Sequence, residues 1–369
     1  MHLLNPAAAT RRRFLVAAGV AAAMTLTACS SASEDTAGPA EGPVAAEDIV
    51  LVQAIRSLSN PYHANWVRGA ELYAESVGME VQVLSDDGDS QKQLSQIRSL
   101  LSQDKTVVLN VDPNTSSDAQ AIVNAVTDAG GYVVTQWNKP DDLHPWDVSD
   151  QWVAHIGFDG SVGGKDIADA LFEEMGGSGG IIALQGILDN VPAQQRYAGL
   201  EAALAENPGI ELLDQQTASW DRATAFDVTQ TLLAKHGDAV KGIWAANDGM
   251  ALGAREALIA AGRTDVPIVG IDAVPEALEL LQDPDSGYVA TVSSDAYWQG
   301  GAATALAYKA AIGEYDVAAA SEDDREFFGT QYLVTAENVE DFLAEPTIEA
   351  YQADFDDPLA RSTGGSSSD

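Results

Sequence analysis

Short runs of apolar residues alternate with longer segments of helical periodicity along most of the chain, from about residue 48 to residue 358. The runs are rich in β-branched residues and are typical of buried strands, whereas the longer segments favour amphipathic helices. Strands that are apolar almost throughout, each followed by a helix, indicate parallel sheets covered on both faces. In the first part of the chain the predicted strands are 49–55, 81–84, 107–111 and 132–135, and the predicted helices are 60–76, 91–101 and 117–129.

The same alternation starts again near residue 153, after a long loop. The chain holds too many strand–helix units for one simple sheet, so we expect an α/β fold with two similar lobes. The predicted strands of this part are 153–156, 181–184, 211–217, 242–245, 266–270 and 289–292, and the predicted helices are 161–175, 193–206, 222–235, 249–261, 275–281 and 297–311.

The N-terminal segment has the layout of an export signal. Arginines at 11–13 precede an apolar run over 15–26 that is too short to span a bilayer as a helix. The order Arg-Arg-Arg-Phe-Leu resembles the twin-arginine export motif, and a general secretory signal, which also begins with arginine, is the alternative. The order Leu-Thr-Ala-Cys over 26–29 resembles the bacterial lipoprotein box, which implies that Cys29 is acylated and that 1–28 is a cleaved signal peptide.

Two segments outside the periodic region lack any apolar period. Residues 29–47 are rich in Ser, Ala, Gly, Pro and acidic residues, and we expect a flexible linker between a lipid anchor and the folded body. Residues 359–369 have a similar polar composition and are predicted to be a disordered tail. Because the signal predicts export, we expect the body outside the cytoplasmic membrane. It would be attached to the membrane through lipid alone, since acyl chains insert by burying their CH₂ groups.

Composition and charge narrow the range of partners. The chain has 369 residues, of which 46% are hydrophobic, which is enough for one large or two ordinary globular domains. With 56 acidic and 19 basic residues its formal net charge is −37, which argues against nucleic acid or an anionic membrane surface but not against a neutral ligand. The single cysteine excludes an internal disulfide, and the 5 histidines lack the paired spacing of a metal site. We therefore expect no metal and no other cofactor.

Ligands of open α/β sheets bind beyond the carboxyl ends of the strands, so the residues that follow each predicted strand are the first candidates for a site. These residues combine planar polar groups with aromatic rings. A sugar requires both, because its hydroxyls take donors and acceptors together while its C–H face stacks on an aromatic ring. Tyr62, Trp137 and Trp220 recur at this edge and favour a polyhydroxylated ligand. Helix N-capping is the alternative role for the polar residues Asn60, Asp221, Asp272 and Asp295.

These segments resemble the ribose-binding and glucose/galactose-binding proteins, which are periplasmic solute-binding proteins of the pentose/hexose type. The resemblance covers about residues 48–345, and the order and spacing of its motifs make it specific. The matching motifs are Asn60-Pro61-Tyr62, Leu184-Gln185-Gly186 with Arg196 and Gly199, Trp220-Asp221-Arg222, Ala246-Asn247-Asp248-Gly249-Met250-Ala251-Leu252-Gly253-Ala254 and Gly270-Ile271-Asp272.

The resemblance implies the type I periplasmic binding protein fold, in which two Rossmann-like lobes with parallel sheets are joined by a three-strand hinge. We expect the hinge strands near 153–158, 293–296 and 328–334. The expected lobes are 48–155 with 295–330, and 156–294 with 331–358.

By the same resemblance, Asn60, Asn247 and Asp272 would hydrogen-bond ligand hydroxyls, and Tyr62 and Trp220 would enclose the sugar ring. Asp112 takes the position of a polar ligand contact after the third strand. Trp137-Asn138-Lys139 resembles the Phe-Asn-Lys of the glucose/galactose branch, in which the Asn binds sugar. The residues expected to contact the ligand are Arg56, Asn60, Tyr62, His63, Asp112, Trp137, Asn138, Gln194, Trp220, Asn247, Asp272 and Ser294.

Three departures from the family pattern leave the sugar open. The ligand arginine of the second lobe falls on Gln194, the polar contact near the last strand falls on Ser294, and Arg56 stands where the ribose branch has a small residue. A charge lost at one position and gained at another implies a changed ligand. A pentose, a hexose and an open-chain polyol all remain candidates.

The resemblance implies a lipid-anchored, monomeric substrate-binding subunit of an ABC importer, with a monosaccharide or sugar alcohol as ligand and the membrane permease as partner. The two lobes would close on the ligand. One alternative is a sugar-sensing co-receptor for a chemoreceptor or a histidine kinase. Another is an extracellular enzyme that uses Asp112 and Asp272 as paired carboxylates, although the sequence offers no nucleophile–base pair.

Overall fold

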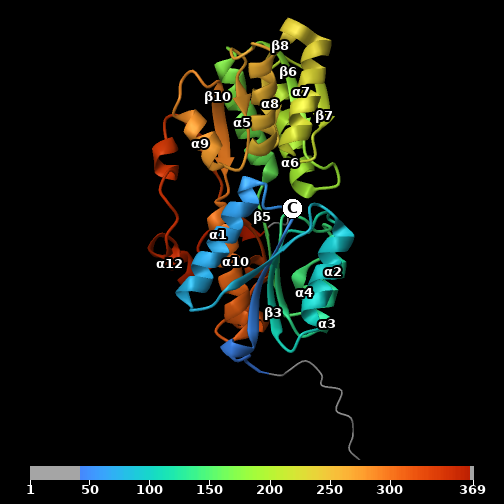
Figure 1. Cartoon of the computed structure of the whole chain (residues 1–369), viewed down its shortest axis with the longest axis vertical. Coiled ribbons are helices and arrows are strands. Elements are labelled where there is room, and N and C mark those ends of the chain that lie inside the picture. The colour runs from blue at the N-terminus through green and yellow to red at the C-terminus, as the bar shows by residue number, and fades with distance from the viewer. Residues whose placement is uncertain (1–41, 366–369) are drawn as a thin grey trace, which may run out of the picture. The chain divides into compact units, whose positions relative to one another are not determined.

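The computed structural model describes residues 42–365, so Cys29, the predicted signal peptide and the last four residues lie outside the described part. Within 42–365 the chain forms two sheets, each flanked by helices (Figure 1). This confirms the predicted α/β fold with two lobes. None of the helices in the described range combines the length and apolar character that a membrane crossing requires.

The first sheet has seven strands and carries helices on both faces. The strands are β1 (Ile49–Ile55), β2 (Val81–Ser85), β3 (Thr106–Val111), β4 (Tyr132–Gln136), β5 (Trp152–Gly157), β11 (Glu326–Gly329) and β13 (Ser362–Gly365). The helices of this lobe are η1 (Ala46–Asp48), α1 (Pro61–Ser76), α2 (Ser90–Leu101), α3 (Asp118–Asp128), α4 (Pro145–Val148), α10 (Ala296–Ala311), η3 (Val317–Ala319), α11 (Glu322–Arg325) and α12 (Ile348–Asp356).

The strands of this sheet lie in the order β13-β11-β5-β4-β3-β1-β2. They are parallel except for β13, which pairs antiparallel with β11. Alternate residues of β1 enter opposite cores, as the two-residue period of a strand requires. Figure 1 shows α1 and α10 on one face of this sheet and α2 and α3 on the other. Leu51 and Ile55 belong to the core on the side of α1 and α10, and Val52 and Ala54 belong to the core on the side of α2 and α3.

The second sheet has six strands, in the order β12-β10-β9-β8-β6-β7. The strands are β6 (Gly179–Gln185), β7 (Ile210–Thr217), β8 (Val240–Ala245), β9 (Ile268–Val269), β10 (Tyr288–Ser293) and β12 (Tyr332–Thr335). The helices of this lobe are α5 (Gly160–Glu174), α6 (Val191–Glu206), α7 (Arg222–His236), η2 (Gly237–Ala239), α8 (Asp248–Ala260), α9 (Pro275–Leu281) and η4 (Val339–Phe342). Only β12 runs antiparallel, against β10.

The chain passes between the two sheets after β5, after β10 and after β11. These passages fall in the three segments where the sequence predicts the hinge. β5 lies in the first sheet beside β4, so the restart of the pattern near residue 153 completes the first lobe, and α5 begins the second.

The C-terminal segment returns to the first lobe. After η4, helix α12 packs against α1 and α10, and β13 extends the first sheet beyond β11. The assignment of 331–358 to the second lobe is therefore wrong for α12, and the prediction of disorder over 359–369 is wrong for Ser362–Gly365. Phe355 anchors α12, because it is 2% exposed and its ring centre lies 5.4 Å from that of Tyr73 in α1. β13 forms through backbone pairing with β11, and its sequence is polar, so it lacks the apolar pattern by which strands are predicted.

Two glycines let α1 and α10 lie against each other. A Cβ at Gly69 would overlap the carbonyl oxygen of Tyr297, and a Cβ at Gly300 would overlap the carbonyl oxygen of Trp66. Because no side chain fits at either position, the backbones of the two helices meet directly. This contact holds α1, which begins at the cleft, against α10, which follows the passage after β10.

Candidate functional site

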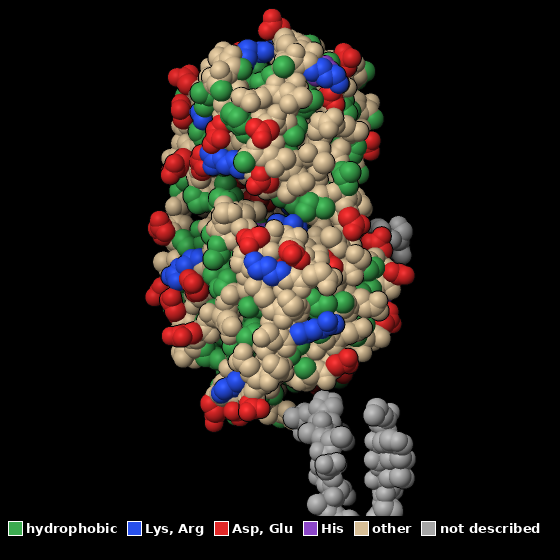
Figure 2. Space-filling model, turned by 45° about the vertical axis from the view of Figure 1, so that its right-hand side comes forward, with side chains coloured by type: hydrophobic (Ala, Val, Ile, Leu, Met, Phe, Trp, Pro, Cys, Tyr) green, Lys and Arg blue, Asp and Glu red, His purple; other side chains and the backbone are tan. Residues whose placement is uncertain are grey.

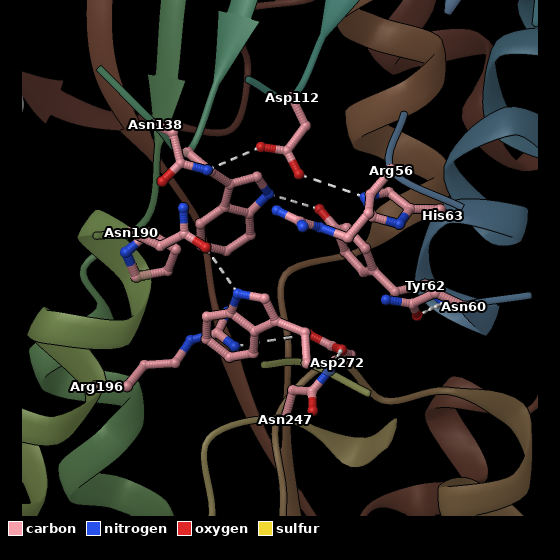
Figure 3. A pocket seen from close by; sticks show the side chains of 13 residues that line it. Arg56, Asn60, Tyr62, His63, Asp112, Asn138, Asn190, Arg196, Asn247 and Asp272 are labelled. Atoms are coloured by element: carbon pink, nitrogen blue, oxygen red, sulfur yellow. Dashed lines mark hydrogen bonds and ion pairs between the residues drawn. The ribbon is translucent and has the colours of Figure 1, made fainter. Parts of the chain in front are cut away.

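A pocket lies where the carboxyl ends of the two sheets face each other (Figure 3). Its empty volume is about 460 Å³. The side chains that line it are Arg56, Asn60, Tyr62, His63, Asp112, Trp137, Asn138, Asn190, Pro192, Arg196, Trp220, Asn247 and Asp272. Ten of the twelve predicted ligand contacts are in this set. Gln194 and Ser294 are not, and Asn190, Pro192 and Arg196 were not predicted.

Both lobes contribute through the loops that follow their strands. The first lobe supplies the β1–α1 loop with the first turn of α1, and the residues after β3 and β4. The second lobe supplies the first turns of α6 and the residues after β7, β8 and β9. Parallel strands end at the same edge of a sheet, so residues far apart in sequence meet there, as the strand-end analysis expects.

Two asparagines of the pocket also cap helices. Asn60 Oδ1 accepts a hydrogen bond from the backbone N–H of Tyr62, and Asn247 Oδ1 accepts from that of Met250, both at 3.0 Å. Capping therefore accounts for both oxygens, and the alternative interpretation predicted this for Asn60 but not for Asn247. Their NH₂ groups are donors, and that of Asn247 lies 3.4 Å from Asp272 Oδ2. Each cap therefore fixes the orientation of a donor at the pocket.

The aromatic wall of the first lobe is held by a chain of hydrogen bonds. Trp137 Nε1 donates to the hydroxyl of Tyr62 at 2.6 Å, and that hydroxyl donates to Gln299 Oε1 at 2.5 Å. Burial raises the pKa of Tyr62 well above its ordinary value, so its hydroxyl stays protonated. Ser294 Oγ accepts from Gln299 Nε2 at 3.0 Å. The structure thus places Ser294 behind the wall, where it supports Gln299, rather than in the pocket.

Three pocket residues have positive φ angles without being glycine. The φ angle is 63° at both Trp137 and Trp220 and 131° at Asp272. Such conformations are strained for residues with a side chain, at a cost of about 1–3 kcal/mol each, and they concentrate at functional sites. The ring of Trp220 covers Gly186, where an added Cβ would overlap the indole. The surrounding structure therefore fixes where these side chains point.

Arg196 is the central cation of the pocket. It is 4% exposed, and its guanidinium carbon lies 5.1 Å from the ring centre of Trp137 and 5.5 Å from that of Trp220. Its Nη1 donates to the carbonyl oxygen of Ala246 at 2.7 Å and lies 3.9 Å from Asp272 Oδ1. Burial lowers the pKa of Arg196, and the nearby carboxyl of Asp272 raises it. Among the described residues, nothing accepts a hydrogen bond from the buried Nε.

Helical geometry explains why Arg196 rather than Gln194 reaches the pocket. Two residues along a helix correspond to a rotation of roughly 200°, so the two side chains leave α6 on opposite sides. Gln194 Nε2 donates to the carbonyl oxygen of Leu188, at 2.8 Å. The helical phase of 193–206 was the signal that could have identified Arg196.

The carboxylate of Asp112 is held by two neighbours from its own lobe. Its Oδ2 lies 3.3 Å from His63 Nε2, and its Oδ1 accepts from Asn138 Nδ2 at 3.0 Å (Figure 3). Arg56 Nη2 donates to the carbonyl oxygen of Asn114 at 3.1 Å. The pocket thus combines arginine and amide donors with carboxyl acceptors, a set that suits a neutral ligand with many hydroxyls.

Hydrogen bonds join the two lobes at the rim of the pocket. Asn190 Nδ2 donates to the carbonyl oxygen of Asn114 at 2.8 Å, and Asn190 Oδ1 accepts from Trp220 Nε1 at 2.8 Å. The backbone N–H of Val191 donates to Asn138 Oδ1 at 3.3 Å. Asn190 therefore links the first lobe to an aromatic residue of the second. No group of three or more potential metal-ligating residues occurs in the described range 42–365.

A family model described as a periplasmic binding protein domain matches residues 52–315. The chain belongs to this family. This periplasmic binding protein is 32% identical over 240 residues to the ribose import binding protein of Salmonella typhimurium, a match that covers 65% of this chain and 77% of that protein. It is 29% identical over 232 residues to the D-allose-binding periplasmic protein of Escherichia coli, covering 62% of this chain and 74% of the relative.

Solved structures support the same relationship. A twin-arginine translocation pathway signal protein from Burkholderia phytofirmans is 41% identical with a TM-score of 0.82, covering 87% of this chain and 99% of that one. An ABC transporter solute-binding protein from Bacillus halodurans with bound myo-inositol is 28% identical with a TM-score of 0.66, covering 80% of this chain and 97% of that one. Since the Salmonella relative is an import binding protein and the Bacillus halodurans neighbour is an ABC transporter solute-binding protein, the enzyme alternative is not favoured, and neither is the co-receptor alternative.

Proposed function

We propose that this periplasmic binding protein is the extracytoplasmic substrate-binding subunit of an ABC importer and that it binds a neutral monosaccharide or sugar alcohol between its lobes. The observation that carries the proposal is the pocket itself, which combines aromatic faces with hydrogen-bond donors and acceptors from both lobes. Relatives named for ribose and allose and a neighbour with bound myo-inositol support this ligand class.

Within this proposal each group has a distinct role. The NH₂ groups of Asn60 and Asn247 donate to ligand hydroxyls, and the carboxylate of Asp112 accepts from them. Trp137 and Trp220 provide the apolar surfaces against which the C–H face of the ligand packs. These roles explain why helix-capping asparagines and strained tryptophans occupy the same edge of the pocket.

Arg196 takes over the role that the family pattern would give to position 194. Its buried Nε lacks a partner within the described residues, so a ligand oxygen that accepts from it would satisfy a buried donor. Asp272, at 3.9 Å from Arg196, would accept from a ligand hydroxyl on the same side. The pair therefore offers a donor and an acceptor to one diol.

Transport would follow from closure of the two lobes. A ligand that contacts both lobes binds the closed arrangement more tightly and shifts the equilibrium towards it. The bonds of Asn190 and Val191 across the rim add to the closed arrangement by joining the two lobes directly. The membrane permease would then recognise the closed form, in which surfaces of both lobes have a fixed relation.

We further propose that the protein acts as a monomer and is held at the membrane through acylated Cys29, after export by the twin-arginine route. The order of residues at 11–15 and 26–29 supports this location. The relative from Burkholderia phytofirmans, described as a twin-arginine translocation pathway signal protein, is consistent with that route. Mass spectrometry of the N-terminal peptide from cell membranes would test the acylation, and an unmodified Cys29 would contradict the lipid anchor.

The direct test is a thermal-shift and calorimetric screen of the purified protein against pentoses, hexoses and sugar alcohols. A ligand at 1,000 times its Kd should add about 4 kcal/mol to the free energy of unfolding. One narrow class of hits, bound at one ligand per chain, is the expected result. A folded protein that responds to no member of the panel would contradict the proposed ligand class.

A matched pair of variants tests how the site is assigned. Arg196→Gln removes the central cation and leaves Asp272 without its partner, so affinity should fall by about a hundredfold or more. Gln194→Ala, in the same turn of α6 but outside the pocket, should change affinity less than twofold or so, as surface substitutions usually do. Equal losses in both variants would show that the structure assigns the wrong residue of α6.

A further inference from the structure

The C-terminal segment adds a fourth passage between the lobes. The three passages after β5, β10 and β11 form the expected hinge, and the chain then leaves η4 in the second lobe and reaches α12 and β13 in the first. Residues 343–365 of this segment contact two of the other three passages.

Arg361 is the residue through which the segment makes these contacts. Its Nη1 donates to Asp295 Oδ2 at 2.7 Å, and Asp295 lies in the passage between β10 and α10. Its backbone carbonyl accepts from the N–H of Thr330 at 3.1 Å and from the hydroxyl of Thr330 at 3.0 Å, and Thr330 lies in the passage between β11 and β12. One residue therefore joins two hinge passages.

The side chain of Arg361 is itself held in place. Its Nε and Nη2 donate to the two carboxylate oxygens of Asp354 at 2.9 and 2.6 Å. This bidentate geometry fixes the plane of the guanidinium. Trp298 and Tyr351 flank it, with each ring centre 5.8 Å from the guanidinium carbon. Arg361 thus reaches Asp295 as a preorganised group rather than as a flexible surface chain.

Asp295 is strained and densely bonded at the point where the hinge passage enters α10. Its φ angle is 52°, in the left-handed region. Its Oδ1 caps α10 by accepting from the N–H of Trp298 at 3.1 Å and also accepts from the hydroxyl of Tyr351 at 3.0 Å. A residue in this backbone conformation persists where the surroundings over-determine it. Arg361 and Tyr351, both from the C-terminal segment, hold Asp295 in this conformation through their hydrogen bonds to its carboxylate.

Empty space borders this junction. A second cavity between the lobes, with an empty volume of about 1440 Å³, is lined among others by Ser293, Asp295, Tyr332, Leu343 and Arg361. Packing therefore does not by itself prevent the passages from moving. The polar contacts of Arg361 are the specific restraint on the backbone that must rotate when lobes move.

We infer that Arg361 is a positioning residue that braces the hinge and thereby sets the equilibrium between open and closed lobes. The network is present in the same arrangement as the rim bonds of Asn190, which join the two lobes. Its loss shifts the population towards open lobes. Ligand affinity then falls in proportion to the decrease in the fraction of protein with closed lobes. This consequence alone rests on the proposed function.

The lobe equilibrium can be measured without any ligand. Spin labels at Val77→Cys near the end of α1 and Ile259→Cys on α8 place one exposed probe on each lobe of the full-length chain, with Cys29→Ser to avoid a third label. Pulsed electron–electron double resonance measures the distribution of distances between the two spin labels. Arg361→Ala should add a longer-distance population, and Arg361→Lys, which keeps the charge, should restore part of the short one.

Arg263→Ala is the matched control. Arg263 also has two acidic neighbours, Asp238 and Asp265, and it bonds the carbonyl oxygens of Gly237 and Val240, so its contacts lie in the second lobe. Its loss should leave the distance distribution unchanged. If Arg361→Ala gives the wild-type distribution, or if Arg263→Ala gives the same shift, the brace is refuted.

Two milder variants guard against misfolding of Arg361→Ala. Tyr351→Phe removes one hydroxyl from Asp295, and Asp295→Asn weakens the contact with Arg361 while keeping a side chain that can cap α10. Each should lengthen the mean distance in the same direction. Wild-type distributions in both variants would refute the brace even if Arg361→Ala cannot be purified.

Affinity measurements separate this inference from the proposed function. For a sugar that binds the wild-type protein, Arg361→Ala should weaken binding roughly tenfold, within the usual range of coupling between sites. A shift in lobe distance with no sugar bound by the wild type would contradict the proposed ligand class and keep the brace. Wild-type binding with no shift in lobe distance would contradict the brace and keep the proposed function.

Discussion

The buried carboxyl group of Asp272 makes the protonation state of the pocket depend on pH. Burial raises the pKa of Asp272 above its ordinary value, Arg196 lowers it in part, and Asp248 beneath the pocket raises it further. Asp248 is itself held by the hydroxyls of Tyr288 and Thr291 at 2.7 and 2.8 Å. The folded protein therefore retains a proton on Asp272 at pH values where the unfolded chain has released it.

This proton has a predictable effect on stability. A carboxyl whose pKa is raised on folding stabilises the protein fully below the ordinary aspartate pKa of about 4, and that stabilisation is lost as pH rises towards the raised pKa. Asp272→Asn removes the titration. Without ligand, the unfolding temperature of the wild type should therefore fall relative to that of Asp272→Asn as pH rises above about 4, which thermal scans over a pH series would measure.

Asp89→Asn is the control for this series. Asp89 caps α2, is exposed and lies outside the pocket, and asparagine can cap in its place. Its unfolding temperature should follow the wild-type dependence on pH. Identical pH profiles for the wild type and Asp272→Asn would contradict the raised pKa.

The sequence predicted most of the pocket and missed particular residues for physical reasons. Residues after strands, such as Asn60 and Asp112, could be identified because the edge of a parallel sheet brings them together. Arg196 lay within a quoted motif, yet its role depends on the phase of α6, which residue spacing alone could have indicated. Asn190 has no such signal, because its importance comes from bonds to the other lobe.

Close contact between α1 and α10 governs stability at the level of elements. Gly300→Ala would place a methyl group against the carbonyl oxygen of Trp66, so one helix must move. We expect a loss of about 1–3 kcal/mol in the free energy of unfolding, as for other overpacked sites. Denaturant titration of the two proteins would measure this loss.

Gly163→Ala in α5 is the matched control, since it also replaces a glycine inside a helix. An added Cβ there meets its nearest atoms at ordinary contact distances of 3.6 to 3.7 Å. The variant should be neutral or slightly more stable, because alanine favours helix. Similar losses at both positions would show that the helix contact is not the cause.

Elements were predictable where apolar periodicity exists and not where backbone pairing alone builds them. The strands of both sheets, such as β1 and β3, are apolar runs and were identified. β13 has the sequence Ser-Thr-Gly-Gly, and it is a strand because Phe327 and Gly329 of β11 offer an open edge. α12 is short, and it is its contacts, such as the burial of Phe355 against Tyr73, that reveal which lobe it joins.

Charge acts at the scale of the whole molecule. The formal net charge is −37, and Figure 2 shows acidic side chains spread over both lobes of the face drawn. Such an excess repels itself and destabilises the compact state. Raising the salt concentration from about 0.01 M to 0.15 M shortens the Debye length from about 30 Å to 8 Å, so the unfolding temperature should rise.

Calorimetry in NaCl and in KCl would test this prediction, because screening depends on ionic strength and not on which cation is used. An unfolding temperature that is constant or that falls over this range would show that local ion pairs outweigh the net repulsion. Ligand affinity should change little with salt, since the proposed ligand is neutral.

The return of the C-terminal segment to the first lobe has a consequence for the order in which the protein can fold during synthesis. The α-helices and parallel strands of the second lobe lie in one stretch, from α5 to β10, whereas the first sheet is complete only after β11 and finally β13. The lobe that is synthesised first is therefore completed last. Until Ser362–Gly365 emerge, the outer edge of β11 is unpaired, and open edges invite pairing between chains. Ribosome-bound chains that end just before β13 are the ones in which aggregation should be greatest.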